Sequence, residues 1–306
     1  SQVATRGCAT RPFRLEDNMA ELEQQQTLDP LVLPRMGNRI WTLAAALFGF
    51  MLILLIPVLA VLTGPAGVAT DFAARLSPPD WAHWFGTDQM GHDLMARTIK
   101  GLRTSLWVGL LASCCSVVIA TALALAATTG GRWADAVVSL LVDATLGLPH
   151  LVLLILICFA LGGGPVAVTI AVALTHWPRL TRILRAEILQ VRQADYVVSA
   201  RHFGKSWVEI TFGHVLPQIL PQMLVGLVLM FPHAILHEAS LTFLGFGLDP
   251  TRPAIGVMLS DSMRYLTAGK WWLGLFPGLC LLLLVLSFDA VGNGMRLVLD
   301  PRTAQT

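Results

Sequence analysis

The amino-acid sequence predicts an all-α integral membrane protein with six transmembrane helices. The chain has 306 residues, of which 55% are hydrophobic and only 13% are charged, and its mean hydropathy is +0.67. Its apolar residues come in uncharged blocks long enough to cross a bilayer, at about 20 residues each, rather than in amphipathic periods. These observations argue against an ordinary soluble domain and favour one helical membrane domain over residues 40–298.

Six blocks mark the predicted helices in chain order. The third and fourth belong to one apolar run from Ala136 to Pro178, whose only charge is Asp143 and which is too long for a single span. The sequence from Gly162 to Pro165 divides this run, because three glycines and a proline are strong helix breakers. The other four spans are Ile40 to about Gly64, Thr104 to Gly131, Val215 to about Leu236, and Leu273 to about Phe288.

Arginine and lysine are unevenly distributed between the loops. An even number of spans places both termini on one side, and that side holds 14 of the 21 basic residues. The positive-inside rule therefore predicts cytosolic termini, with an N-terminal segment over 1–39 and a tail over 299–306. Segments 65–103 and 238–272 are then periplasmic. Residues 1–39 contain no apolar core that resembles a cleavable signal, and Met19 is an alternative start residue.

Composition also limits the partners. The net charge is only +2, and because the basic residues already account for the topology, no nucleic-acid partner is expected. Four of the five cysteines lie inside apolar spans, where cysteine behaves as a small hydrophobe, so no disulfide framework is expected.

A polar segment over residues 195–212 interrupts the apolar runs before the fifth span. On a single helix, five of its residues at spacings of four, three, four and three would form one apolar stripe. The stripe comprises Tyr196, Ala200, Phe203, Trp207 and Ile210. Such a helix either docks on a partner or lies in the membrane interface. Gly204 allows a bend in it, and Pro217 falls in the first turn of the next span, where its missing N–H does little harm.

The same segment resembles the "EAA" signature of ABC importer permeases, E-A-A-x(3)-G-x(9)-I-x-L-P. It departs from the signature at Val198, Ser199 and His214, which replace glutamate, alanine and isoleucine. In that family the segment is the coupling helix, which sits in a cleft of the cytosolic ATPase and transmits its motion to the membrane helices. The resemblance implies coupling roles for Asp195, Tyr196, Val198, Ser199, Ala200, Arg201, Phe203, Gly204, Trp207, Leu216 and Pro217.

Further motifs resemble the peptide/nickel branch of these permeases, and the likeness covers residues 36–302. Residues 83–106 resemble its G-T-D-x-x-G-R-D-x-x-S-R block, with His92 in place of an arginine, and residues 238–247 and 299–302 resemble other blocks of the branch. The matching periplasmic residues are Gly86, Thr87, Asp88, Gly91 and Asp93. The sequences "THW" at 175–177 and "LHEA" at 236–239 look more like the nickel and metal-chelate members.

The resemblance implies a type I ABC importer permease fold and a C-type permease of a dipeptide, oligopeptide or nickel importer. It also implies a place in the bacterial inner membrane, a periplasmic binding protein, a second homologous permease subunit and two cytosolic ATPase subunits. ATP and Mg²⁺ would bind to those ATPase subunits. This chain itself is expected to need no cofactor and to carry no catalytic residue.

Two short motifs that point to enzymes are incomplete. Residues 199–206, "SARHFGKS", end like a phosphate-binding loop, but Ser199 replaces the first glycine and no strand precedes it. The sequence "HEASL" begins like a zinc-protease motif, but Leu241 replaces the second histidine. Neither ATP binding nor zinc-dependent hydrolysis by this chain is therefore expected.

Three ionisable residues at the outer end of the fifth span are candidate substrate contacts. They are His233, His237 and Glu238, and such groups are costly to bury in a membrane unless they serve a function. A spacing of four puts the two histidines on one helix face, and imidazole suits nickel. The alternative is simple interfacial anchoring. A secondary transporter or channel driven by an ion gradient also remains open, although the sequence shows no clear inverted repeat.

Overall fold

The computed structural model describes residues 36–65 and 67–299, with side chains from Arg39 onward. The chain divides into two units, Ser1–Trp41 and Thr42–Thr306, and the second holds every site discussed below. The predictions for residues 1–35, for Met19 and for the tail from residue 300 lie outside the described residues. Within the described ranges all regular elements are helical, as predicted.

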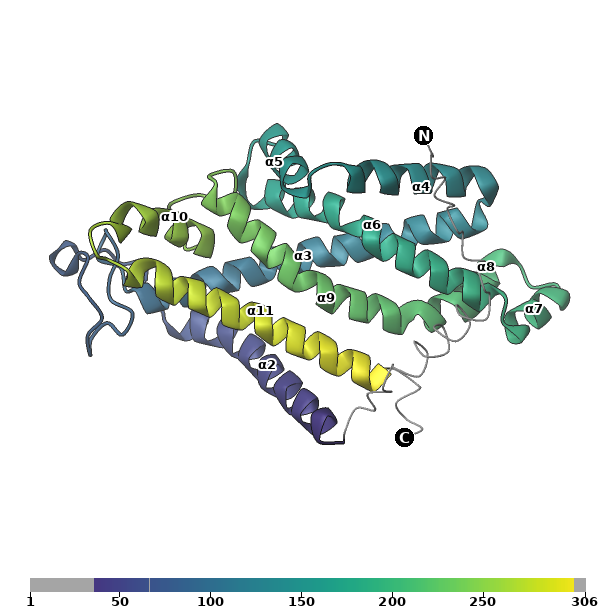
Figure 1. Cartoon of the computed structure of the whole chain (residues 1–306), viewed down its shortest axis with the longest axis horizontal. Helices are drawn as coiled ribbons and strands as arrows, with labels where there is room; N and C mark the ends of the chain where they lie inside the picture. The colour runs from purple at the N-terminus through teal and green to yellow at the C-terminus, as the bar shows by residue number, and fades with distance from the viewer. Residues whose placement is uncertain (1–35, 66, 300–306) are drawn as a thin grey trace, which may run out of the picture. The chain divides into compact units, whose positions relative to one another are not determined.

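Five long helices carry most of the structure, and shorter helices connect them (Figure 1). The long helices are α2 (Met36–Leu62), α3 (Leu94–Thr129), α6 (Gly164–Arg192), α9 (Leu216–Phe243) and α11 (Trp272–Leu299). The shorter elements are η1 (Phe72–Ala74), α4 (Gly131–Gly147), α5 (His150–Ala160), α7 (Asp195–His202), α8 (Trp207–Ile210), the π-helical turn η2 (Thr211–Val215) and α10 (Ile255–Leu266).

The described residues hold four helices that are long and apolar enough to cross a membrane, or five if α4 and α5 together count as one bent span. By length and composition, the described residues therefore hold one span fewer than the six that the sequence predicts, even when α4 and α5 are counted as one span. The difference lies in α6, which is 29 residues long but carries histidine, proline and several arginines from His176 onward. Only its first half has the composition of a membrane span.

The predicted third span is not one straight helix. Helix α4 ends at Gly147 and α5 begins at His150, and the two axes differ by 98°. Pro149 explains the break, because a proline disfavours helical backbone angles in the residue before it. Leu148 accordingly adopts an extended conformation, with φ −89° and ψ 144°.

Helices α3 and α6 pack along a seam of small residues. Ala112, Ala120 and Ala124 of α3 are fully buried, and Ser116 donates a hydrogen bond of 2.8 Å from Oγ to the carbonyl oxygen of Ala173 on α6. Small side chains let helix backbones approach closely, which is how helices associate where lipid removes the hydrophobic driving force.

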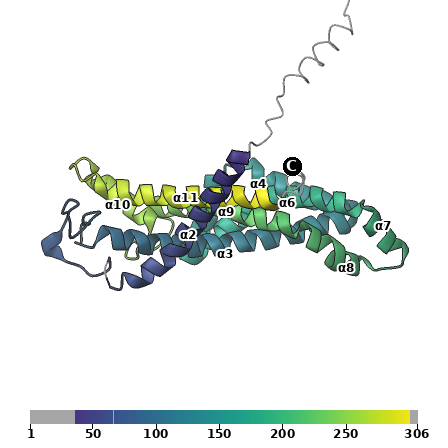
Figure 2. The ribbon, with the colours of Figure 1, turned by 90° about the horizontal axis from the view of Figure 1, so that it is seen from below.

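The two predicted polar regions lie at opposite ends of the unit Thr42–Thr306. Figures 1 and 2 both show residues 67–93 and α10 at one end, and α7 and α8 at the other. Helix α3 begins at Leu94, ten residues before its predicted start at Thr104. The prediction is late because the charged residues Arg97, Lys100 and Arg103 end the apolar block but not the helix.

Candidate functional site

The coupling segment consists of two short helices joined by a bend. Helix α7 ends at His202, Gly204 follows with φ +81°, and α8 begins at Trp207. A φ in this range is natural for glycine and strained for most other residues. Ser206 caps α8 by accepting a hydrogen bond of 3.3 Å from the backbone N–H of Glu209, while the Glu209 carboxylate accepts one of 2.7 Å from the backbone N–H of Ser206.

This bend makes the prediction of a single helical stripe wrong. Because the segment is split after His202, its apolar residues do not share one face. Phe203 is 87% exposed and Tyr196 is 49% exposed, whereas Ile210 is 1% exposed and Ala200 is buried. Phe203 is thus the apolar side chain that this segment presents most openly.

A groove lies beside the bend, between the end of α6 and the two short helices. Trp207 lies in it between two guanidinium groups, with the Cζ of Arg192 4.2 Å and the Cζ of Arg201 5.6 Å from the centre of its ring. Such cation–π contacts hold the indole in place. The groove is lined by Leu189, Arg192, Gln193, Val197, Val198, Arg201, His202 and Trp207.

The coupling segment continues into α9 without a loop. The π-helical turn η2 joins α8 to α9, and the whole stretch Trp207–Phe243 forms one 37-residue helical span. Pro217 lies in the first turn of α9, as predicted. Single π-turns of this kind are frequent at functional sites.

At the opposite end, the predicted periplasmic motif forms a tightly bonded cap on α3. The Asp88 carboxylate is buried and pairs with the guanidinium of Arg97, and it lies 2.8 Å from Nδ1 of His92. Burial disfavours the charged carboxylate, but the Arg97 charge and the hydrogen bonds from His92 and Met90 outweigh it and hold the pKa of Asp88 below its ordinary value.

The other motif residues shape the same cap. Thr87 is buried; its hydroxyl bonds to the carbonyl oxygen of Ala74. Asp93 is the N-cap of α3, accepting a hydrogen bond of 2.8 Å from the backbone N–H of Ala96. Gly86 and Gly91 have φ of +74° and +78°, and a Cβ at Gly91 would lie 1.7 Å from the carbonyl oxygen of Asp71. Gly86 and Gly91 therefore determine the backbone path of the loop that precedes α3.

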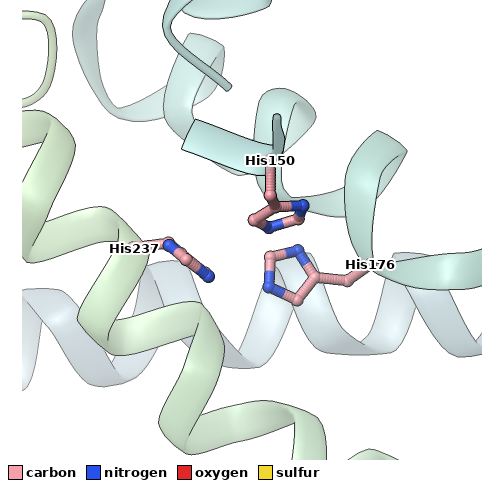
Figure 3. Close-up of side chains that lie close together, drawn as sticks. All are labelled: His150, His176 and His237. Carbon is pink, nitrogen blue, oxygen red and sulfur yellow. The ribbon is translucent and has the colours of Figure 1, made fainter. Parts of the chain in front are cut away.

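The three candidate residues on α9 point to different neighbours. Glu238 is fully buried and accepts hydrogen bonds from Ser105, at 2.6 Å, and Thr242, at 3.0 Å. His233 is exposed, and its Nδ1 lies 3.1 Å from the carbonyl oxygen of Leu229 on its own helix. His237 faces away from the neighbours of Glu238 and His233 and points towards α5 and α6 (Figure 3).

There His237 meets two histidines that the sequence did not group with it. The imidazoles of His150, at the start of α5, of His176 on α6 and of His237 converge in Figure 3. One nitrogen from each lies within 4.8 Å of the others. We call these three residues the histidine triad. His176 belongs to the "THW" sequence, but no spacing along the chain indicates that it meets His150 and His237.

Comparison with known proteins places this architecture in a family. Residues 116–305 match the family described as binding-protein-dependent transport system inner membrane component. A predicted peptide permease protein of Brucella suis biovar 1 is 37% identical over 275 residues, covering 88% of this chain and 90% of its own length. The dipeptide transport system permease protein DppC of Alkalihalophilus pseudofirmus is 36% identical over 242 residues, covering 79% of each chain.

These matches cover most of the chain, and the family match includes the coupling segment. Proteins of this kind are membrane components without enzymatic activity, and ATP is hydrolysed by a separate subunit. The chain therefore belongs to the binding-protein-dependent inner membrane components and is an ABC transporter permease.

Proposed function

We propose that this chain is one permease subunit of an ATP-driven importer of dipeptides or oligopeptides. The observation that carries the proposal is the similarity, at 37% identity over 88% of the chain, to a protein described as a peptide permease. A second relative is described as a dipeptide permease. Family membership does not favour the alternative of a transporter or channel driven by an ion gradient.

The two polar ends support different functions for the two sides of the protein. The cap around Asp88 and α10 would face the periplasm and receive substrate from a binding protein. The coupling segment would face the cytosol and bind an ATPase subunit there. The exposed Phe203 side chain offers an apolar contact, and the groove beside Trp207, which is lined by Arg192 and Arg201, offers a basic one. A second permease subunit would complete the pathway, and two ATPase subunits, which bind ATP and Mg²⁺, would drive it.

One observation favours a second substrate class, nickel or a metal chelate. Three imidazoles meet inside the helical unit, and imidazole is a ligand for nickel and neighbouring transition metals. A peptide importer and a metal-chelate importer need the same coupling machinery, so the two candidates differ only in what the binding protein delivers.

Reconstitution tests the proposal directly. The chain would be placed in proteoliposomes with its partner permease, its ATPase subunits and its binding protein, and uptake of a radiolabelled dipeptide panel would be measured with and without ATP. We expect ATP-dependent dipeptide uptake that stops when the catalytic residue of the partner ATPase is replaced. Uptake of nickel or a nickel chelate with no dipeptide uptake would favour the second class. ATP-independent uptake driven by an ion gradient would refute the importer mechanism.

A further inference from the structure

We propose that His150, His176 and His237 form a binding site for one divalent transition-metal ion, such as Ni²⁺, Co²⁺, Cu²⁺ or Zn²⁺, within the helical unit of the permease. The site joins the consecutive helices α5 and α6 to α9, which lies later in the chain. Metal binding at these rings does not depend on peptide being the transported substrate.

The spacing of the rings fits a shared ion. An ion about 2.0–2.1 Å from a nitrogen of each imidazole would lie about 3.2 Å from each ring centre, and tetrahedral angles would then separate the ring centres by about 5 Å. The observed separations are 4.6 Å between His150 and His237, 4.9 Å between His150 and His176, and 5.1 Å between His176 and His237. The ring centres therefore already lie at the separations that one shared ion requires.

The hydrogen bonding of His176 prepares one ligand atom. Its Nδ1 lies 2.9 Å from the carbonyl oxygen of Val172, and because a carbonyl can only accept, this nitrogen carries the proton. The other nitrogen, Nε2, then holds a free lone pair. Metal-binding histidines typically donate their second N–H to a carbonyl or carboxylate in this way, which fixes the ring and strengthens the ligand.

The remaining two rings have their nitrogens available. Within the described residues, His150 and His237 contact the triad through their rings and form no hydrogen bond to another side chain or carbonyl. All three triad residues are half-buried, so part of each side chain stays accessible. Three imidazoles leave a fourth coordination position for water or for a ligand carried with the metal.

Chemistry selects the class of ion. Imidazole nitrogens suit Ni²⁺, Cu²⁺, Zn²⁺ and Co²⁺, whereas Mg²⁺ and Ca²⁺ prefer oxygen ligands. The exposed guanidinium of Arg179 acts electrostatically on His150, and Glu238 points away, towards Ser105. Among the residues that the structure describes, the triad thus has no carboxylate ligand and has a positive neighbour, which weakens its hold on a cation.

Metal binding would be measured on the full-length permease in its complex, in lipid nanodiscs and purified by a tag without histidines. Co²⁺ is the spectroscopic probe, because tetrahedral nitrogen coordination gives intense visible absorption, and Ni²⁺ is titrated by equilibrium dialysis. We expect one Co²⁺ per chain with tetrahedral bands. His176→Ala should weaken binding by more than about ten-fold, because loss of a ligand should cost at least as much as loss of a hydrogen-bond partner of a ligand, and the triple alanine variant should abolish binding.

Two further variants separate a metal site from a structural cluster. His233→Ala lies one helical turn from His237 and outside the triad, so it should bind Co²⁺ like the unchanged protein. His237→Cys replaces one ligand by another and should retain binding with a shifted absorption band, because thiolate also binds these metals. Ni²⁺ should also raise the melting temperature of the unchanged complex but not that of the triple variant.

Several outcomes would overturn the proposal. One is the absence of stoichiometric Co²⁺ or Ni²⁺ binding to the unchanged complex, and another is equal binding by the triple alanine variant. Loss of binding in His233→Ala with retention in His176→Ala would place the metal elsewhere. Because the readout is metal binding and not uptake, these results are independent of whether the complex imports peptides.

Discussion

Replacing Gly204 by valine tests whether the bend between α7 and α8 transmits ATP-driven motion. The structure predicts a purely conformational defect. A Cβ at Gly204 would meet nothing within 4 Å, so the valine side chain has space, but the backbone φ of +81° is one that side-chain-bearing residues rarely adopt. The change therefore strains the bend without disturbing the packing around it.

The size of the strain follows from this geometry. Holding an ordinary L-residue in the left-handed region costs about 1–2 kcal/mol, and a β-branched residue is among the least tolerant. That energy is small compared with the roughly 5–15 kcal/mol by which a typical domain is stable against unfolding. It nevertheless lowers the population of the native bend, relative to other backbone conformations, by a factor of about 5–30. We therefore expect a membrane-inserted protein whose two short helices are misaligned.

Two variants control for the side chain itself. Gly213→Val places the same residue in the adjoining π-helical turn η2, also with nothing within 4 Å of its Cβ but without a positive φ, and should retain activity. Gly204→Asn should retain more activity than Gly204→Val, because asparagine tolerates the left-handed region better than other side-chain-bearing residues. The assay is ATP-dependent uptake and substrate-stimulated ATP hydrolysis by the reconstituted complex.

We expect Gly204→Val to lose most of its uptake while the yield of assembled complex stays normal. Uptake and stimulated hydrolysis at the level of the unchanged protein would refute the coupling role of this bend. If Gly204→Asn and Gly213→Val were as defective as Gly204→Val, the backbone explanation would be wrong.

Three other regions give predictions of their own. Asp88→Asn leaves the buried Arg97 guanidinium without its counter-ion and should cost about 3–5 kcal/mol. The folded state lowers the pKa of Asp88 below its ordinary 3.8. The charged carboxylate therefore stabilises the fold fully above that pH, and this stabilisation is lost as the pH falls through the lowered pKa. The melting temperature of the variant should accordingly fall less at acid pH than that of the unchanged protein. Glu238→Ala should lower the melting temperature more than Glu238→Gln, since glutamine still accepts a hydrogen bond from a neighbouring hydroxyl whereas alanine leaves a cavity and unpaired groups; equal effects would contradict this. In a cysteine-free background, cysteines at the exposed positions Ala82 and Ser206 should be labelled only from the periplasm and only from the cytosol, respectively, and the reverse pattern would contradict the orientation.

Local sequence signals predicted the helix boundaries that depend on glycine and proline. The break at Gly162 to Pro165 separates α5 from α6 as expected, because these residues act on the backbone directly. Pro149 acts in the same way, but it lies inside an uncharged run and was read as part of one span. The cause of the 98° bend was therefore visible in the sequence as the Leu148-Pro149 pair.

The sites were predictable only where their residues are neighbours in the chain. The bend at Gly204 and the placement of Pro217 follow from local preferences of these residue types. Asp143, the single charge of its apolar run, pairs with Arg182, and no spacing along the chain indicates this partner. The histidine triad could not be foreseen, because it depends on how three helices pack, and periodicity describes one helix at a time.

The unbroken helical stretch from Trp207 to Phe243 connects the coupling segment directly to the histidine triad. At about 1.5 Å per residue, the 30 residues from Trp207 to His237 span roughly 45 Å, and no loop separates the coupling segment from the triad. Pro217, Pro221 and Pro232 lie within this stretch, after the π-helical turn η2, and prolines and π-turns are where a helix can flex. A stroke at the coupling end would thus tilt His237 against two rings carried by other helices. The cycle of ATP binding and hydrolysis would then open and close the histidine triad.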